Sequence, residues 1–152
     1  MALFHACDIR GVALSELTTE LAQKIARAIG VKLQNKKVVV GGDVRTSTPT
    51  FKNIIIDGLK ASGCEVVDIG TVATPVFYYA IKTQMADGGV MITASHNPAK
   101  YNGFKLVLGE NPVKEEDIKE IEKLVQQDAK FDSVGSVITI DIIDDYIKYI
   151  SD

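Results

Sequence analysis

The sequence is poor in the residues from which disulfide scaffolds, metal sites and membrane spans are built. It has two cysteines, two histidines, four prolines and no tryptophan among 152 residues. Cys7 and Cys64 lie far apart and match no spacing of metal ligands, so we predict no disulfide scaffold and a reducing, cytoplasmic location. No apolar run approaches the length of about 18 residues that spans a bilayer, and residues 1–5 lack the character of a signal peptide. We therefore expect no membrane partner.

The charge balance is close to neutral, with a formal net charge of −3. Because no basic stripe is present to displace counterions from phosphates, we expect no nucleic-acid partner. Hydrophobic residues make up 46% of the chain and charged residues 24%, which is ordinary for a globular protein and unlike a disordered one. The length fits one domain that buries enough surface for a core of its own.

Hydrophobic spacing predicts helices that alternate with strands. From Leu17 to Leu33 a leucine or isoleucine recurs every four residues, which indicates an amphipathic helix. Thr-Pro pairs at 48–49 and 74–75 are typical of helix starts. The expected elements are helix 18–33, strand 37–41, helix 48–63, strand 65–70, helix 74–85, strand 88–93, strand 103–108, helix 113–127 and helix 141–150. This order favours an α/β fold, a three-layer sandwich with a mixed, mostly parallel sheet between helices, one hairpin late in the chain and a loop at 128–137.

The segment Thr-Ala-Ser-His-Asn-Pro at residues 93–98 has the most promising chemistry. It follows a predicted strand, and ligands of open α/β sheets bind beyond the carboxyl ends of strands. The hydroxyl of Ser95 is a weak nucleophile unless it is activated or modified, and histidine, the type of its neighbour His96, titrates near neutral pH. A surface loop without chemistry fits the same residues. A serine-hydrolase elbow does not, because Gly-x-Ser-x-Gly is absent.

Three further segments contribute candidates. Asn102-Gly103 predicts a tight turn that returns Lys105 toward the serine loop. The sequence Asp-Ile-Arg-Gly at 8–11 fits either a turn that faces a phosphate or a local pair of Asp8 with Arg10. The glycine pair that opens the segment 41–47 fits an anion site at a helix N-terminus. A plain βα turn, in which the aspartate and the arginine of that segment pair, fits it equally.

Taken together, these segments resemble the α-D-phosphohexomutases, the phosphoglucomutase/phosphomannomutase family. Residues 93–98 match the phosphoserine loop of that family and residues 101–105 match its continuation. Residues 8–11 resemble its early arginine motif, residues 42–45 its Gly-x-Asp-x-Arg segment and residues 74–75 its Thr-Pro helix start. Five ordered matches make chance a poor explanation. A cysteine, Cys7, stands where family members often have tyrosine.

The resemblance implies a role for each matched residue. Ser95 would carry the phosphoryl group and, once phosphorylated, would be one ligand of a Mg²⁺ ion. His96, Lys105 and Arg10 would assist proton transfer, and Arg10, Asn97 and Lys105 would contact the substrate. The implied substrates are hexose phosphates, which the enzyme interconverts between the 1- and 6-phosphate through a hexose 1,6-bisphosphate. A cationic cluster around a phosphorylated serine is consistent with this chemistry, because phosphoryl transfer depends on positioning and charge stabilisation.

The resemblance covers nearly the whole chain but about a third of such an enzyme. The metal loop Asp-Gly-Asp-x-Asp-Arg, the sugar-selecting loop and the phosphate-clamping loop of the family are absent from this sequence. We therefore expect residues 1–152 to be the N-terminal domain, domain I, with the remaining domains outside this chain and no mutase activity in isolation. The alternatives are a stand-alone module that binds a phosphosugar or a partner without catalysis, and a nucleotide-binding regulator.

Overall fold

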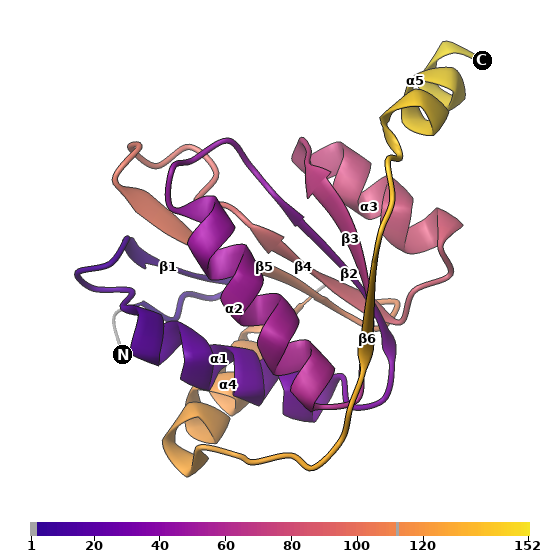
Figure 1. Ribbon diagram of the computed structural model, residues 1–152. Helices are drawn as coiled ribbons and strands as arrows, with labels where there is room; N and C mark the ends of the chain where they lie inside the picture. Colours follow the sequence, from indigo (N-terminus) through magenta and orange to yellow (C-terminus); the bar gives the residue numbers. More distant parts are fainter. Residues whose placement is uncertain (1–2, 112) are drawn as a thin grey trace.

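A six-stranded sheet with helices on both faces forms the centre of the computed structural model, which describes residues 3–111 and 113–152 (Figure 1). The strands lie in the order β1-β5-β4-β2-β3-β6. In chain order the elements are β1 (Asp8–Val12), α1 (Thr19–Lys32), β2 (Lys37–Gly42), α2 (Thr48–Ala61), β3 (Glu65–Thr71), α3 (Thr74–Thr83), β4 (Gly88–Ile92), β5 (Tyr101–Leu108), α4 (Glu115–Gln127), β6 (Ser136–Thr139) and α5 (Ile143–Ser151). The α/β sandwich with a mixed, mostly parallel sheet is therefore confirmed.

The sheet changes direction at β5. Strands β4, β2, β3 and β6 are parallel neighbours, whereas β5 runs antiparallel to both β4 and β1. The predicted late hairpin is the β4–β5 pair. The loop that joins these strands lies at the carboxyl end of β4, beside the loop that follows β2, because parallel neighbours end at the same edge of a sheet.

Sequence signals account for the starts of three helices. The hydroxyl of Thr18 accepts a hydrogen bond from the backbone N–H of Leu21 and so caps α1. Pro49 and Pro75 occupy the first turns of α2 and α3, where a missing N–H costs no helical hydrogen bond. The N-cap of α2 is Ser47 rather than the expected Thr48, whose side chain serves the site described below.

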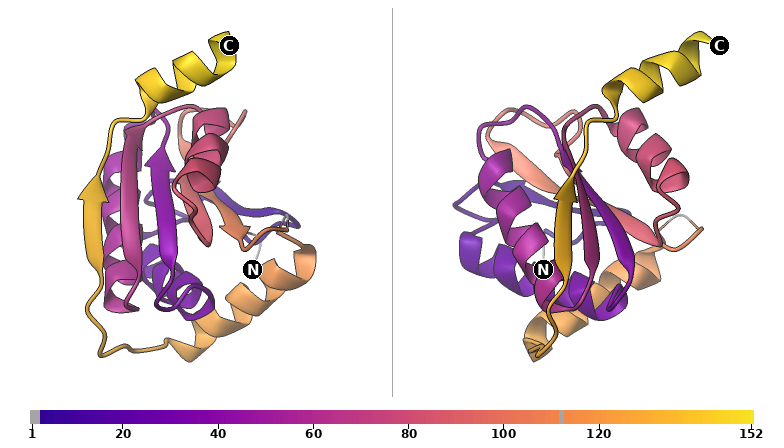
Figure 2. Two further views of the ribbon diagram at one scale, coloured as in Figure 1. Left: turned by 90° about the vertical axis from the view of Figure 1, so that its right-hand side faces the viewer. Right: turned by 45° about the vertical axis from the view of Figure 1, so that its right-hand side comes forward.

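Two apolar layers separate the sheet from its helices. Alternate residues of the central strands, such as Val38 and Val39, face opposite layers. The larger layer lies under α1, α2 and α4, and α3 covers the smaller one. Figure 2 (left) shows α3 on the opposite side of the sheet from α2. Because α3 packs against β2 and β4, it leaves the same face of β1 and β5 uncovered. We call this face of β1 and β5 the open face.

Three strands correct the sequence-based expectations. Of the two alternatives for residues 8–11, the turn is wrong, because Asp8–Val12 is strand β1, whose side chains alternate between half-buried and buried. Asn102 and Gly103 do not form a turn either, since both lie within β5. The predicted loop at 128–137 ends early because Ser136–Thr139 pairs with β3 as the edge strand β6.

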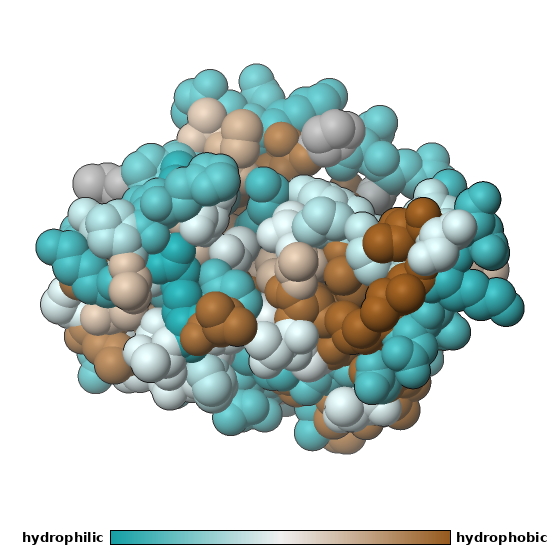
Figure 3. Space-filling view, turned by 90° about the horizontal axis from the view of Figure 1, so that it is seen from above, coloured by the Kyte–Doolittle hydropathy of each residue, from teal (hydrophilic) through white to brown (hydrophobic). Residues whose placement is uncertain are grey.

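The last helix projects from the end of the sandwich. Both views of Figure 2 show α5 beyond the ends of the strands, connected through β6. Tyr146 and Tyr149 stack against Tyr79 of α3, with ring centroids 5.4 and 4.9 Å apart. Ile143, Ile147 and Ile150 are 37%, 51% and 60% exposed, and an apolar stripe crosses the right side of Figure 3, over α5.

Ion pairs join surface elements at the other end of the molecule. Arg27 of α1 contacts Asp128, which ends α4 in a left-handed conformation. The hydrogen bond from Arg27 lowers the pKa of Asp128 below its ordinary value. Among residues 3–111 and 113–152, every helix falls short of the length and hydrophobicity that crossing a membrane requires.

The aromatic contact beneath the site gives a test of the core. Phe104 of β5 is fully buried and meets Phe51 of α2 edge to face, with ring centroids 6.0 Å apart. We expect Phe104→Ala to lower the free energy of unfolding by about 3–5 kcal/mol, because the cavity cannot collapse between a strand and a helix. Chemical denaturation measures this loss. Val134→Ala, at a side chain that is 93% exposed, is the control and should change stability by less than about 0.5 kcal/mol.

Candidate active site

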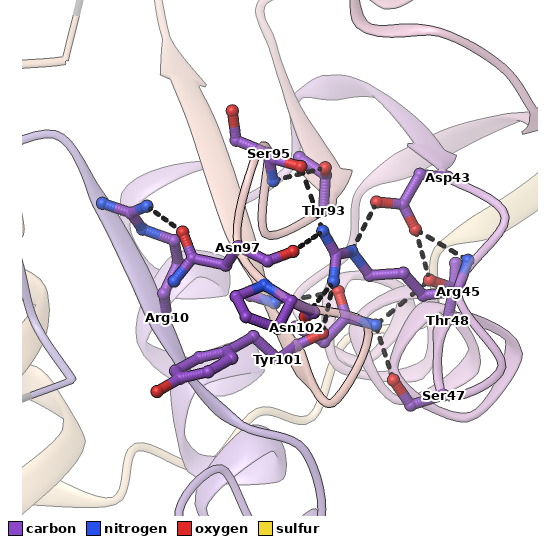
Figure 4. A network of polar contacts seen from close by, with 12 residues as sticks. Arg10, Asp43, Arg45, Ser47, Thr48, Thr93, Ser95, Asn97, Tyr101 and Asn102 are labelled. Atoms are coloured by element: carbon purple, nitrogen blue, oxygen red, sulfur yellow. Dashed lines mark hydrogen bonds and ion pairs between the residues drawn. The ribbon is translucent and has the colours of Figure 1, made fainter.

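Ser95 lies in an exposed loop directly beyond the carboxyl end of β4. Its φ angle of +55° is in the left-handed region, which costs a residue other than glycine about 1–2 kcal/mol. Two hydrogen bonds hold its backbone: the N–H donates to the hydroxyl of Thr93 at 3.0 Å, and the carbonyl accepts from Arg45 at 3.0 Å. In Figure 4 the side chain of Ser95 points away from the guanidinium of Arg45.

Arg45 joins this loop to the loop that follows β2. Its side chain is only 11% exposed. One terminal nitrogen, Nη2, donates to the carbonyls of Ser95 and Asn97, and the other, Nη1, donates to those of Pro98 and Tyr101. The donor–acceptor distances run from 2.7 to 3.0 Å. The serine loop is therefore wrapped around a single guanidinium (Figure 4).

Asp43 orients this arginine. Its carboxylate accepts from Nε of Arg45 at 3.0 Å and from the backbone N–H of Arg45 at 3.1 Å. The hydroxyl of Thr48 donates to the same carboxylate at 2.9 Å. Buried Asn102 donates to the hydroxyls of Ser47 and Thr48 and thereby connects β5 to the start of α2.

A second arginine lies on the open face. Arg10 of β1 donates through Nη1 to the side-chain oxygen of Asn97 at 2.9 Å and through Nε to Asp8 at 3.0 Å. Gly103 pairs with Arg10 across the strands. A Cβ at Gly103 would lie 2.7 Å from Cγ of Arg10 and 2.1 Å from the carbonyl oxygen of Ile9, so only glycine fits beneath this side chain.

Lys105 is half-buried on the same face. In the register of β1 and β5, Lys105 lies directly opposite Asp8. Directly opposed residues point to the same side of a sheet. Lys105 also lines a cavity of about 710 Å³ with Cys7 and with Tyr78 and Ile81 of α3. Ser95 is not among the residues that line this cavity within the described chain. The cavity therefore borders the site on the α3 side rather than containing the serine.

The structure brings some predicted residues together and leaves others free. Arg10 and Asn97 are in direct contact, and the expected pairs of Asp8 with Arg10 and of Asp43 with Arg45 are confirmed. Within residues 3–111 and 113–152, the hydroxyl of Ser95 and the side chains of His96 and Lys105 make no hydrogen bond or ion pair. These groups are available to a ligand.

The roles of four residues were not foreseen from the sequence. For Arg45 the sequence predicted only a pair with Asp43, as one of two alternatives for its segment, and not its bonds to the serine loop. The sequence predicted no contact in the site for three others, which are Thr93, Thr48 and Asn102. It placed them only in motifs or at a helix start. The one sequence signal for them is their place: each lies at or near the carboxyl edge of the sheet, where the loops after β2 and β4 meet.

Comparison with known proteins bears directly on this arrangement. Residues 1–132 match the family description "Phosphoglucomutase/phosphomannomutase, alpha/beta/alpha domain I".

The chain belongs to the phosphoglucomutase/phosphomannomutase family. A "Phosphomannomutase/phosphoglucomutase" of Pseudomonas aeruginosa is 42% identical over 154 residues, which are 99% of this chain and 33% of that protein. A "Probable phosphoglucosamine mutase" of Methanosphaera stadtmanae is 43% identical over 157 residues, 99% of this chain and 34% of that protein. The crystal structure of a phosphoglucomutase/phosphomannomutase family protein from Burkholderia thailandensis superposes with a TM-score of 0.90 at 35% identity, covering 98% of this chain and 35% of that one.

The chain thus spans about one third of the length of these relatives. It corresponds to the first domain of a phosphohexomutase. The resemblance of residues 8–105 to the family motifs is confirmed at the level of the family and the domain.

The residues around Ser95 differ in chemistry from the ligands of the Mg²⁺ that the family resemblance implies. Mg²⁺ prefers six oxygen ligands in octahedral geometry. The charged side chains on the open face are two cations, Arg10 and Lys105, and one carboxylate, Asp8, which already pairs with Arg10. The described residues contain no group of three or more acidic, histidine or cysteine side chains placed to hold a metal. The unmodified site therefore does not fit Mg²⁺ by itself.

The contact between Gly103 and Arg10 gives a test of the site geometry. We expect Gly103→Ala to displace Arg10 and break its bond to Asn97, because the added Cβ overlaps the backbone of β1. Overpacking of this kind lowers stability by about 1–3 kcal/mol.

A crystal structure of the variant and its denaturation curve measure the two effects. Thr139→Ala, on the exposed edge strand β6, is the control and should leave both unchanged. An Arg10–Asn97 bond that persists in Gly103→Ala would contradict the assigned fit.

Proposed function

We propose that this chain is the phosphoserine-bearing domain I, residues 1–152, of a phosphohexomutase, and that Ser95 accepts and returns the phosphoryl group. The observation that supports this most directly is the state of Ser95. It is exposed, its strained backbone is held by two hydrogen bonds, and its hydroxyl is free among the described residues. Strained backbone that is fixed by its surroundings is a feature of functional sites.

The proposed reaction has two transfers in opposite directions. Phosphorylated Ser95 gives its phosphoryl group to a hydroxyl of a hexose phosphate, whose oxygen forms the new P–O bond as the serine P–O bond breaks. The resulting hexose 1,6-bisphosphate reorients, and the Ser95 oxygen attacks its other phosphate and releases the isomeric hexose phosphate. The proton lost by the attacking hydroxyl is returned to the leaving oxygen, so each step is balanced.

Charge on the open face suits this chemistry. Arg10 and Lys105 present cationic groups, and His96 adds an imidazole at the residue after Ser95. Such groups stabilise the negative charge on a phosphoryl group in transfer. We assign Arg10, Asn97 and Lys105 to substrate contact, and His96, Lys105 and Arg10 to assistance of proton transfer.

The choice of sugar and the metal depend on parts outside this chain. The relatives' names include mannose, glucose and glucosamine mutases, so they do not select one sugar. We propose that Mg²⁺, as the cofactor of the complete enzyme, takes one ligand from phosphorylated Ser95 and the others from the following domain. A cytoplasmic location remains part of the proposal.

We expect Ser95 to be phosphorylated when the purified chain is incubated with glucose 1,6-bisphosphate, since the cationic groups and the free hydroxyl are all in this domain. Intact mass should show one added phosphate in the wild type and none in Ser95→Ala. Lys105→Met should slow the transfer by at least about tenfold, the size of a lost charged hydrogen bond. Lys36→Met, directly before the amino end of β2 and so away from the carboxyl edge of the sheet, is the matched control.

The two alternative outcomes are distinct. A chain that binds the bisphosphate but stays unphosphorylated would contradict phosphoryl acceptance by this domain alone and favour a module that binds phosphosugars without catalysis. The isolated chain should show no turnover in a coupled mutase assay with glucose 1-phosphate. Turnover at the rate of a natural enzyme would disprove its dependence on further domains.

The proposed partner of α5 is the rest of the same enzyme. Ile143, Ile147 and Ile150 line one side of this helix in contact with solvent, and the curated relatives are about three times as long as this chain. Exposed apolar patches mark interaction surfaces.

In isolation this surface should cause self-association. Size-exclusion chromatography at rising concentration should show it in the wild type and not in Ile147→Lys. The control Val134→Lys, at an exposed apolar residue outside α5, should behave as the wild type. A wild type that stays monomeric at all concentrations would contradict this assignment.

A further inference from the structure

We propose that Arg45 is a positioning residue for the phosphoryl acceptor: it holds the serine loop closed around its guanidinium and keeps Ser95 in the left-handed conformation. Arg45 does not bind the phosphoryl group itself. This inference rests on the proposed role of Ser95, and it adds a residue that family resemblance and sequence spacing left without a function.

Arg45 has no free hydrogen-bond donor with which to bind an anion directly. A guanidinium has five N–H donors. Arg45 uses one on Asp43 and four on the carbonyls of Ser95, Asn97, Pro98 and Tyr101. All five donors are therefore occupied inside the protein, and the side chain is 11% exposed.

Arg10 differs in this respect. Among the described residues it uses Nε on Asp8 and Nη1 on Asn97, and the side chain is 29% exposed. Donors on its terminal nitrogens remain for an anion. The two arginines next to the serine loop thus have separate roles, Arg45 inside the loop and Arg10 on the open face.

The conformation of Ser95 explains why such a residue is needed. Left-handed backbone at a serine persists only where the surroundings determine it. Thr93 fixes the N–H of Ser95 and Arg45 fixes its carbonyl, so both peptide groups that flank the side chain are held. Their combined effect directs the hydroxyl away from Arg45, as Figure 4 shows.

The same contacts set the electrostatics of the loop. Four carbonyl oxygens that turn toward Arg45 direct their partial negative charge at a cation that is itself balanced by Asp43. That charge is not directed at the exposed side of the loop, where a phosphorylated Ser95 would lie. Lysine cannot replace this arrangement, because its ammonium has three donors and no planar fork.

Solution NMR of the labelled 152-residue chain tests the proposal. Backbone chemical shifts and scalar couplings report φ of Ser95, and hydrogen exchange reports opening at the amides of Ser95, Asn97 and Tyr101. We expect Arg45→Lys to move Ser95 out of the left-handed region and to speed exchange at these amides by at least about tenfold, because several hydrogen bonds to a charged group are lost. Amides of the central strands should keep their exchange rates.

Two further variants keep the test decisive where Arg45→Lys does not fold. Thr93→Val removes the acceptor for the N–H of Ser95 and should change the shifts of Ser95 without opening Tyr101, whereas Thr93→Ser keeps a hydroxyl and should restore the wild-type spectrum. Arg27→Lys, at another partly buried arginine paired with an aspartate, is the matched control and should leave the serine loop unchanged.

The outcomes separate the positioning role from the proposed function. Wild-type φ and wild-type exchange at Ser95 in both Arg45→Lys and Thr93→Val would overturn the inference. Where the wild type accepts phosphate from glucose 1,6-bisphosphate, Arg45→Lys should accept it at least about tenfold more slowly and Arg27→Lys at the wild-type rate. A wild type that accepts none counts against the function of Ser95, and the spectra still decide the role of Arg45.

Discussion

The hydrogen bonds of the Arg45 side chain connect the loop after β2 to the loop after β4, and the rest of the site depends on this connection. Parallel pairing of β2 with β4 places the two loops side by side, and the N–H of Asp43 donates to the carbonyl of Ile92 at 3.0 Å. Sheet pairing reaches only to Thr93, whose N–H donates to the carbonyl of Gly103 at 2.9 Å. The guanidinium, oriented by Asp43 and Thr48, supplies the contacts that the ladder no longer makes. A loop exposed to water thereby acquires one conformation, and the position of Ser95 follows from it.

The open face arises from the sheet topology. Because β5 returns antiparallel to β4, no crossover helix is required between them, and α3, the crossover between β3 and β4, covers only the parallel part of the sheet. The β5–β1 edge is left with one face that bears Asp8 and Arg10 of β1 and Lys105 of β5. The opposite face of the same strands carries Ile9 and Phe104, both fully buried. Alternation along two short strands thus places cationic groups on one side and a rigid core on the other.

Local sequence patterns were sufficient to predict most of the helices and strands and the position of Ser95 at the end of a strand. Periodicity and Thr-Pro pairs located the long helices, and the run from Gly88 into Ser95 located the site at a strand end, because these signals depend only on neighbouring residues. Long-range pairing was not predictable in the same way. Asn102-Gly103 has the composition of a turn, yet it lies in β5 because it pairs with Arg10 and Gly11 of β1, which are far away in sequence. The side chain of Arg10 occupies the space above Gly103, so that position requires glycine. Strand β6 is short and exposed, so it lacks the alternation that marks a half-buried strand. The partners of Arg45 are backbone carbonyls, which no side-chain pattern encodes.

Solvent exposure explains why a domain that holds the acceptor serine is expected to need further domains. Arg10 and Lys105 lie on a face that no helix covers, and ionic interactions are weak where the effective dielectric constant is high. The same charges act more strongly on a phosphoryl group once water is excluded from the site. This chain has no element among its described residues that covers the open face, whereas its last helix presents isoleucines to solvent beyond the carboxyl edge of the sheet. Positioning of the serine is thus a local property of this domain, and exclusion of water from it requires surface that another domain supplies.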